Sequence, residues 1–109
     1  MTARITHWID GKLWDGEAER SGEVYNPATG EVTARVDFAG PKEIEAAVAS
    51  AKAAFPKWRD TSLAKRQAVL FAFRSLLDAK RRELAEIITS EHGKAVDDAL
   101  REIARGIES

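Results

Sequence analysis

The sequence predicts an α+β fold, with antiparallel hairpin strands in the N-terminal third and then three helices, one of them long. Residues 1–39 contain Asp-Gly turn signals and a stretch of alternating apolar and polar side chains, which is typical of half-buried strands. After residue 40, apolar residues recur every three or four positions, the period of a helix. A chain of 109 residues forms one domain at most, and we expect residues 1–109 to be a single, partial domain.

Two short strands are expected between Ile5 and Trp14, joined by a turn at Asp10-Gly11. Asp-Gly supplies two residues that tolerate the positive φ angles of a type I′ hairpin turn. The stretch 17–22 is polar, and residues 26–30 (NPATG) favour turns. Residues 1–39 are therefore predicted as strands and turns.

A half-buried strand is predicted over residues 32–38. Its apolar residues fall on one face and its polar residues on the other, as the period of two in a strand requires. The buried face is predicted to hold Val32, Ala34, Val36 and Phe38, and the solvent face Thr33, Arg35 and Asp37.

A helix is predicted over residues 40–58. Gly40-Pro41 favours a helix start, because proline fits the first helical position, and Glu43 lies near the positive end of the helix dipole. Pro56 disfavours helical geometry at the residue before it, so we expect the regular helix to end at Phe55.

The longest predicted element is one helix over residues 61–92, with Thr61 as N-cap and Gly93 as the residue that ends it. At 1.5 Å per residue, its roughly 30 residues span about 45 Å. A compact chain of this size has a radius of gyration of only about 13 Å. The helix therefore either stands out of its own domain or belongs to a larger body.

The last helix is predicted over residues 94–109. Asp97 and Asp98 fall in its first turns and read as charges at a helix start, and Arg105 falls almost opposite the apolar stripe. The stripe consists of Val96, Ala99, Leu100, Ile103 and Ile107. Because this period is still running at Ser109, we expect the helix to be truncated there.

Composition excludes several classes of function. The 17 basic and 18 acidic residues are interspersed, with a net charge of −1, so no basic face for nucleic acid is expected. Cysteine is absent and the two histidines lie far apart, so we expect no disulfide, no cysteine nucleophile and no metal site. No apolar run reaches the length of a membrane span and no signal peptide is apparent. A cytoplasmic protein without membrane contact is expected.

No complete catalytic or cofactor site is found. The Gly40-Pro41 junction is a weak candidate for a phosphate cradle, and a plain helix start is favoured. In EHGK, residues 91–94, we expect Gly93 to end a helix whose negative end His92 and Lys94 complement. The tryptophans, Trp8, Trp14 and Trp58, are predicted to pack against the hairpins and helices and not against a ligand.

Several stretches of the chain together resemble the start of the aldehyde dehydrogenase superfamily. They are IDGKLWDG, YNPATGEV, IEAAVASAKAAFPKW, RQAVLFAF and EHGKAVDDALREIARGIE, and they span essentially the whole chain. NPATGE and a helix ending in GK are shared across the superfamily. EHGK followed after a short gap by RGIE resembles its CoA-acylating, methylmalonate-semialdehyde branch.

The resemblance implies a parent enzyme of several hundred residues with an α/β, Rossmann-like NAD-binding domain, to which this chain contributes. NAD and CoA are the cofactors of such an enzyme, and a cysteine is its nucleophile. We expect no catalytic and no cofactor-binding residue in the chain, and neither activity nor cofactor binding by the chain alone. The expected partners are the remainder of the dehydrogenase fold and further copies in a homo-oligomer.

One site residue is carried over from the resemblance. The arginine of the RG[IL]E motif is associated with the substrate carboxylate in the semialdehyde branch, and it corresponds to Arg105. A planar guanidinium suits a carboxylate. Relatives usually have glycine where this chain has Arg101, which puts the usual packing of that helix in doubt. Two alternatives stay open: a short non-enzymatic helical interaction protein, and a fragment of a general aldehyde dehydrogenase.

Overall fold

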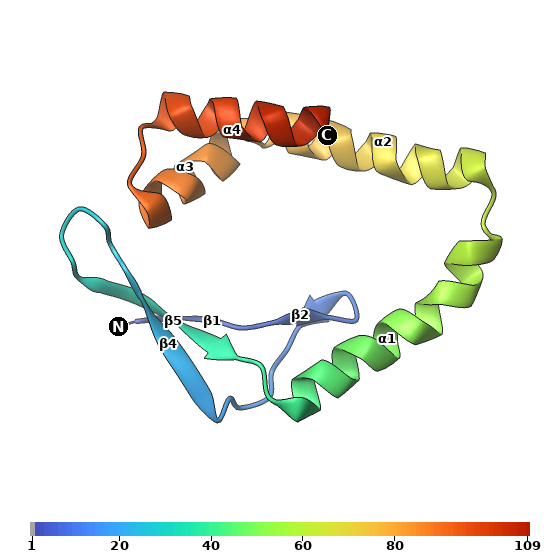
Figure 1. Cartoon of the computed structure of the whole chain (residues 1–109), viewed down its shortest axis with the longest axis horizontal. Helices are drawn as coiled ribbons and strands as arrows, with labels where there is room; N and C mark the ends of the chain where they lie inside the picture. Colours follow the sequence, from blue (N-terminus) through green and yellow to red (C-terminus); the bar gives the residue numbers. More distant parts are fainter. Residues whose placement is uncertain (1) are drawn as a thin grey trace. The chain divides into compact units, whose positions relative to one another are not determined.

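The computed structural model describes residues 2–109, which form two compact units. The first unit contains the residues up to Tyr25 together with Glu31–Asp60. The second contains the turn Asn26–Gly30 together with Thr61–Ser109. Figure 1 shows the order of strands followed by helices, which confirms the predicted α+β class. Residues 2–109 contain four helices, however, and not the predicted three.

The strands of the first unit form a three-stranded and a two-stranded sheet. In the larger sheet, β5 (Val32–Phe38) lies between β1 (Ala3–Ile5), which runs parallel to it, and β4 (Arg20–Tyr25), which runs antiparallel. The smaller sheet is the hairpin of β2 (Trp8–Ile9) and β3 (Lys12–Leu13).

The hairpin confirms the turn predicted from Asp10-Gly11. Asp10 has a φ of 57° and Gly11 a φ of 75°, the two positive angles that a type I′ turn needs. The antiparallel pairs are therefore present as predicted, but the sequence did not predict that β1 pairs in parallel with β5 or that the polar stretch 17–22 enters a strand. At Gly22 the ring of Phe38 lies close over the backbone, since a Cβ there would lie 2.6 Å from Cζ of Phe38. Neither the parallel pairing nor this contact leaves a local pattern in the sequence.

The predicted solvent face of β5 was wrong at Asp37. This residue is 8% exposed and accepts hydrogen bonds from Nε and Nη2 of Arg4 at 2.8 and 2.6 Å. On the predicted apolar face Ala34 is buried, whereas Phe38 is 45% exposed. A paired carboxylate, as well as apolar side chains, therefore anchors the middle of the sheet.

Helix α1 (Pro41–Asp60) completes the first unit. It begins where the sequence predicts, with the carboxylate of Glu43 accepting a hydrogen bond of 2.8 Å from the backbone N–H of Gly40. The predicted end at Phe55 was wrong, because the helix continues through Pro56. Phe55 and Arg59 lie on either side of this proline, one helical turn apart. The Arg59 guanidinium lies 5.7 Å from the centroid of the Phe55 ring, and this cation–π contact favours a helix that continues past Pro56.

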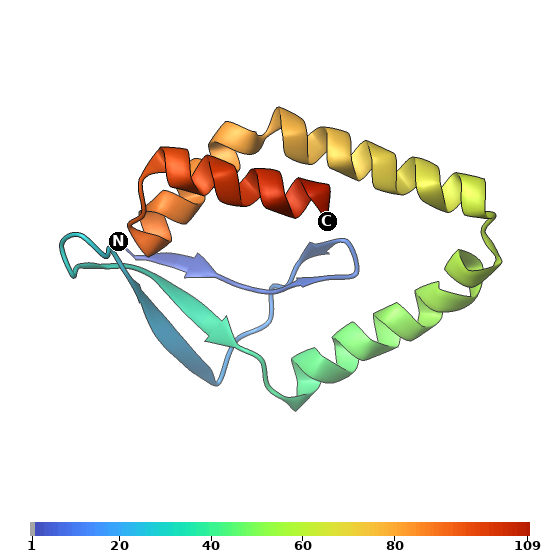
Figure 2. The same cartoon turned by 45° about the horizontal axis from the view of Figure 1, so that its top comes forward.

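The second unit contains α2 (Leu63–Ala79), α3 (Arg81–His92) and α4 (Val96–Glu108). The single helix predicted over residues 61–92 was therefore wrong: the chain leaves helical geometry at Lys80, whose φ is −105° and ψ 15°. Figure 2 shows the change of direction between α2 and α3. No glycine or proline marks this point, and packing explains it, because α3 can then lie against α4.

Hydrogen bonds cap the start of α2 and the end of α3. Ser62, not the predicted Thr61, caps α2, its Oγ accepting a hydrogen bond of 3.3 Å from the N–H of Lys65. Gly93 ends α3 as predicted, with a φ of 87° and its N–H donating to the Thr89 carbonyl at 2.9 Å.

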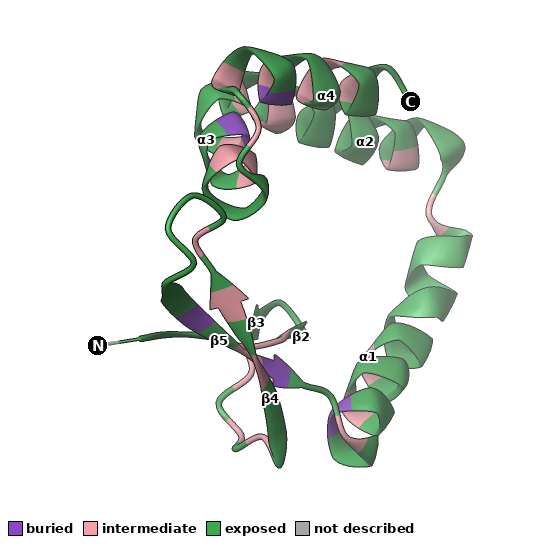
Figure 3. Cartoon of the chain, turned by 60° about the vertical axis from the view of Figure 1, so that its left-hand side comes forward, coloured by how far each residue is buried: buried purple, intermediate pink, exposed green. Residues whose placement is uncertain are grey.

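The cores of both units are small. Among residues 2–109, the buried apolar residues are Ala34, Ala85 and Ala99, and two carboxylate residues, Asp37 and Glu43, are buried as well. Figure 3 colours buried positions purple and shows that most of the chain is exposed. Large apolar side chains remain exposed on both units, and Trp8 at 69% and Trp58 at 42% do not pack as predicted. None of the helices within residues 2–109 is both long and apolar enough to cross a membrane.

Candidate functional site

Helix α4 presents Arg105 on its exposed side. The predicted apolar stripe of this helix is confirmed, since Ala99 is buried and Leu100, Ile103 and Ile107 are half-buried. Arg105 lies two residues after Ile103, about 200° around the helix, and its side chain is exposed. The prediction that Arg105 faces away from the stripe is therefore confirmed.

Two ion pairs on and beside α4 involve three of its other charged side chains. Asp98 accepts a hydrogen bond from Nη2 of Arg101, three residues further along the helix. Glu102 accepts one from Nζ of Lys94 at 2.5 Å, although Lys94 precedes the helix and lies eight residues away. Asp98 is thus an ion-pair partner as well as a charge in the first turn.

The guanidinium of Arg105 is not part of these pairs. Within residues 2–109 its side chain makes no hydrogen bond and no ion pair, and only its backbone carbonyl is engaged, accepting from Oγ of Ser109 at 3.1 Å. A free, exposed guanidinium carries parallel N–H donors that match the two oxygens of a carboxylate. Chemically, the arrangement can bind an anion at the last turn of α4.

The electrostatics around Glu102 are dominated by Lys94. The hydrogen bond from Lys94 and its charge lower the pKa of the Glu102 carboxyl, and the charge of Arg105 lowers it further. Glu102 is therefore held as a carboxylate close to Arg105 while it is bonded to another cation.

The weak phosphate cradle considered at Gly40-Pro41 is closed. The N–H of Gly40 already donates to Glu43, and the backbone N–H groups of Gly40 and Glu43 lower the pKa of the Glu43 carboxyl. A second anion would meet this carboxylate. The residues of this strand-to-helix junction therefore do not fit the phosphates of a dinucleotide.

In the EHGK segment, Gly93 has the structural role that the sequence predicts, whereas Lys94 does not. Gly93 ends α3, whereas the Lys94 ammonium bonds Glu102 of the next helix instead of complementing the end of α3. Sequence spacing gives no signal for this pair, because it spans eight residues across a left-handed turn. Asp97 and Asp98 do not act as a carboxylate pair, since Asp98 bonds Arg101.

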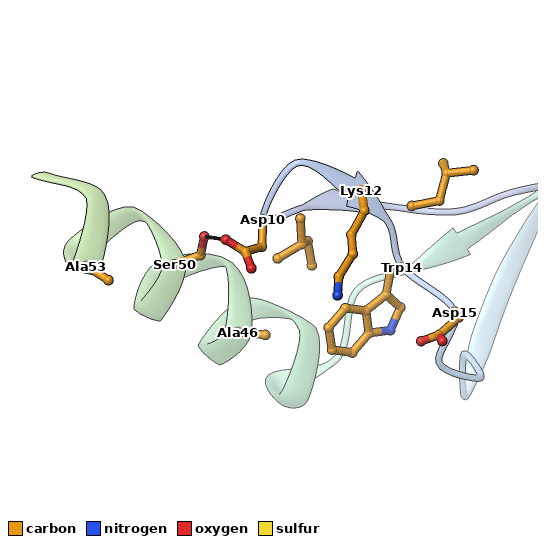
Figure 4. A pocket seen from close by; sticks show the side chains of 9 residues that line it. Asp10, Lys12, Trp14, Asp15, Ala46, Ser50 and Ala53 are labelled. Atoms are coloured by element: carbon orange, nitrogen blue, oxygen red, sulfur yellow. Dashed lines mark hydrogen bonds between the residues drawn. The ribbon is translucent and has the colours of Figure 1, made fainter. Parts of the chain in front are cut away.

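A hollow of about 520 Å³ lies between the hairpin and α1 in the first unit. Figure 4 shows Lys12 and Trp14 extending from the hairpin into it and Asp10 hydrogen-bonded to Ser50, at 3.0 Å. The hollow is open and its charges are mixed, with Asp10, Lys12 and Asp15 at its lining. No convergent set of donors identifies a ligand for it. Among residues 2–109, no group of three or more histidine, aspartate or glutamate side chains could hold a metal ion.

Comparisons with known proteins match this chain over nearly its full length. The sequence model of the aldehyde dehydrogenase family matches residues 14–109. A malonate-semialdehyde dehydrogenase of Lacticaseibacillus casei is 42% identical over 105 residues, 96% of this chain and 21% of the relative. The mitochondrial, acylating methylmalonate-semialdehyde/malonate-semialdehyde dehydrogenase of Rattus norvegicus is 42% identical over 101 residues, 93% of this chain and 19% of the relative.

Solved structures also match the fold of this chain closely. A protein of Sinorhizobium meliloti, crystallised in complex with NAD and assigned to the methylmalonate-semialdehyde dehydrogenases, is 45% identical and superposes with a TM-score of 0.94. The match covers 99% of this chain and 22% of that protein. The chain thus spans about a fifth of the length of the relatives it matches.

Proposed function

Because this chain belongs to the aldehyde dehydrogenase family, we propose that it is the N-terminal part of an NAD-dependent, CoA-acylating dehydrogenase of malonate or methylmalonate semialdehyde. The observation that carries the proposal is the free guanidinium of Arg105. Lys94 ends the EHGK motif and Arg105 begins the RGIE motif, and the two motifs together resemble the semialdehyde branch. The relatives at 42% identity are named for the same two semialdehydes.

In this proposal Arg105 binds the carboxylate that distinguishes a semialdehyde acid from a simple aldehyde. A bidentate contact fixes the carboxylate end of the substrate and thereby orients the aldehyde end. The aldehyde carbon would be attacked by a cysteine thiolate, and cysteine is absent from this chain. The nucleophile therefore comes from another part of the enzyme, and we propose that the chain is inert alone.

We propose that NAD and CoA also bind outside these residues. The strand-to-helix junction at Gly40 is occupied by its own carboxylate, so we assign no cofactor contact to it. When NAD is bound it accepts the hydride of the aldehyde, and CoA accepts the acyl group. In this proposal, Arg105 selects substrates that have a carboxylate, and the rest of the enzyme carries out the hydride and acyl transfers.

Exposed apolar side chains support the proposal that the remainder of the dehydrogenase covers this chain. On α1, Val48 and Phe55 are 52% and 57% exposed, and on α2 Leu70 and Phe73 are 63% and 57% exposed. Burying a Leu or Phe side chain contributes about 1.5–3 kcal/mol, so a covering layer would stabilise both units substantially. We also propose that the whole enzyme is a homo-oligomer.

The proposal is tested by a chimera in which this chain replaces the corresponding N-terminal segment of the Lacticaseibacillus casei enzyme, with which it shares 42% identity. We expect NADH to form from malonate semialdehyde in the presence of NAD and CoA. The isolated chain, assayed in parallel, is expected to form none. A folded chimera without activity would contradict the proposal, as would NADH formation by the isolated chain.

A second candidate, a short helical interaction protein, is favoured by the same exposed side chains on α2. It makes a different prediction for the isolated chain. An interaction protein should form a discrete, stable oligomer, measurable by light scattering after size-exclusion chromatography, and should not restore activity in the chimera.

A further inference from the structure

We propose that Lys94 is a positioning residue that keeps the Arg105 guanidinium free for a carboxylate by holding Glu102 away from it. The inference rests on the proposed function, because it concerns the same substrate-binding arginine. It adds a residue outside the RGIE motif to the determinants of carboxylate binding.

The first argument compares two pairs with the same spacing on one helix. Asp98 and Arg101 are three residues apart and form an ion pair. Glu102 and Arg105 are also three residues apart, with the acidic residue again on the N-terminal side, yet they form none. Helix geometry favours both pairs equally. What distinguishes Glu102 from Asp98 is a partner from outside the helix.

That difference is Lys94. Its ammonium lies 2.5 Å from Oε2 of Glu102, and its side chain is only 26% exposed, compared with 46% for Glu102. Gly93, in the left-handed conformation, ends α3 just before Lys94 and turns the chain toward the start of α4. The lysine thus approaches Glu102 from the α3–α4 connection and not from the same helix.

Removing the ammonium would leave Glu102 with the charges of Arg105 and His92 acting on it. Arg101 already bonds Asp98, whereas Arg105 is free and its charge acts on Glu102. Glu102 would then compete with a ligand by pairing with Arg105. Without the Lys94 ammonium beside it, the negative charge of Glu102 would also repel a ligand carboxylate. A lysine at position 94 prevents both effects without touching the substrate.

The experiment uses the 109-residue chain and nuclear magnetic resonance of the Glu102 carboxyl and the Arg105 guanidinium. In the unmodified chain, Arg105→Gln should change the titration of Glu102 little. In Lys94→Met, the Arg105 Nε–H should show a new contact with Glu102, and adding Arg105→Gln should then raise the pKa of Glu102 clearly. An Arg105 already paired in the unmodified chain, or still free in Lys94→Met, would overturn the inference.

A second measurement places the same variants in the chimera with the Lacticaseibacillus casei enzyme and titrates them with malonate as the carboxylate probe. We expect Lys94→Met to weaken binding about threefold to tenfold, because an intrahelical pair and a nearby like charge both compete with the ligand. Lys94→Met/Glu102→Gln should restore binding, since no carboxylate remains to capture Arg105. Asp98→Asn is the matched control, because it breaks the equivalent pair without involving Glu102, and it should leave binding unchanged.

The outcomes separate the two proposals. If Lys94→Met loses malonate binding and Lys94→Met/Glu102→Gln does not restore it, Lys94 attracts the ligand through its own charge. If Lys94→Met binds malonate unchanged, Lys94 has no part in binding. Either result overturns the positioning role of Lys94 and leaves the role of Arg105 intact. Malonate that binds the unmodified chimera no better than it binds the Arg105→Gln chimera would instead contradict the carboxylate role of Arg105, and with it both proposals.

Discussion

The ring of Pro27 packs directly on Gly93, so that a Cβ at position 93 would lie 3.1 Å from Cγ of the proline and 3.3 Å from its Cβ. Pro27 belongs to the turn between β4 and β5, and Gly93 ends α3, so the contact joins two turns that are far apart in the sequence. Gly93 also has a φ of 87°, an angle that other residues rarely adopt. The backbone angle and the contact with Pro27 therefore both favour glycine at this position.

We predict that Gly93→Ala destabilises the chain. The left-handed conformation alone costs a residue with a Cβ about 1–2 kcal/mol, and the contact with Pro27 adds to that. The free energy of unfolding, measured with urea, should fall by at least this amount. Gly106→Ala is the control, because Gly106 lies in α4 with open space around it, and alanine there should stabilise the helix by about 0.5–1 kcal/mol.

A double-variant cycle separates the two contributions at Gly93. Pro27→Ala removes the Cγ atom that lies nearest to the new Cβ. Gly93→Ala should then cost less in the Pro27→Ala background than in the unmodified chain. An equal cost in both backgrounds would mean that the backbone angle alone sets the requirement for glycine.

The Arg4–Asp37 pair is predicted to make the first unit sensitive to acid. The hydrogen bond from Arg4 is the main cause that lowers the pKa of Asp37 below its ordinary value of 3.8. A lowered pKa in the folded state contributes stability above the unfolded-state value, and this stability is lost as the pH falls from about 3.8 through the folded value. Asp37→Asn should lower the melting temperature at neutral pH and flatten its dependence on pH below 4.

Circular dichroism melts between pH 2 and pH 7 measure this effect. Asp60→Asn is the control, because its ion pair with Arg59 is exposed and such pairs contribute little to stability. The prediction is contradicted if Asp37→Asn and Asp60→Asn give the same profile.

We predict that the Ser62 side chain stabilises the first turn of α2. Its side chain accepts the hydrogen bond of the Lys65 N–H, and the first turn of the helix contains no acidic residue. Ser62→Ala should cost about 1 kcal/mol of unfolding free energy, whereas Ser62→Asp keeps the acceptor and adds a charge that favours the helix dipole. If Ser62→Asp is as unstable as Ser62→Ala in urea, this capping role is excluded.

Local sequence signals predicted those features of the fold that depend on local chemistry. The Asp10-Gly11 turn, the start of α1 at Pro41 and the end of α3 at Gly93 all follow from backbone angles or capping that a few adjacent residues set. The exposure of Arg105 follows from the period of α4 in the same way.

The features that the sequence did not predict depend on contacts between distant residues. Lys80 separates two helices without any helix-breaking residue, because the packing of α3 on α4 favours the turn there. Asp37 is buried because Arg4, on a parallel strand 33 residues earlier, pairs with it. The Lys94–Glu102 pair at the candidate site is of the same kind. Periodicity describes one element at a time and contains no information on such pairs.

The substrate role of Arg105 gives the last prediction, for the chimera with the Lacticaseibacillus casei enzyme. A hydrogen bond to a charged group is worth about 1.5–3 kcal/mol, so Arg105→Ala should lower kcat/KM for malonate semialdehyde about tenfold to a hundredfold. Propanal has no carboxylate and should be oxidised with nearly unchanged kcat/KM. Arg101→Gln serves as the matched control, because Arg101 lies one helical turn away and bonds Asp98. Equal losses for both aldehydes would remove Arg105 from carboxylate recognition and favour a general aldehyde dehydrogenase.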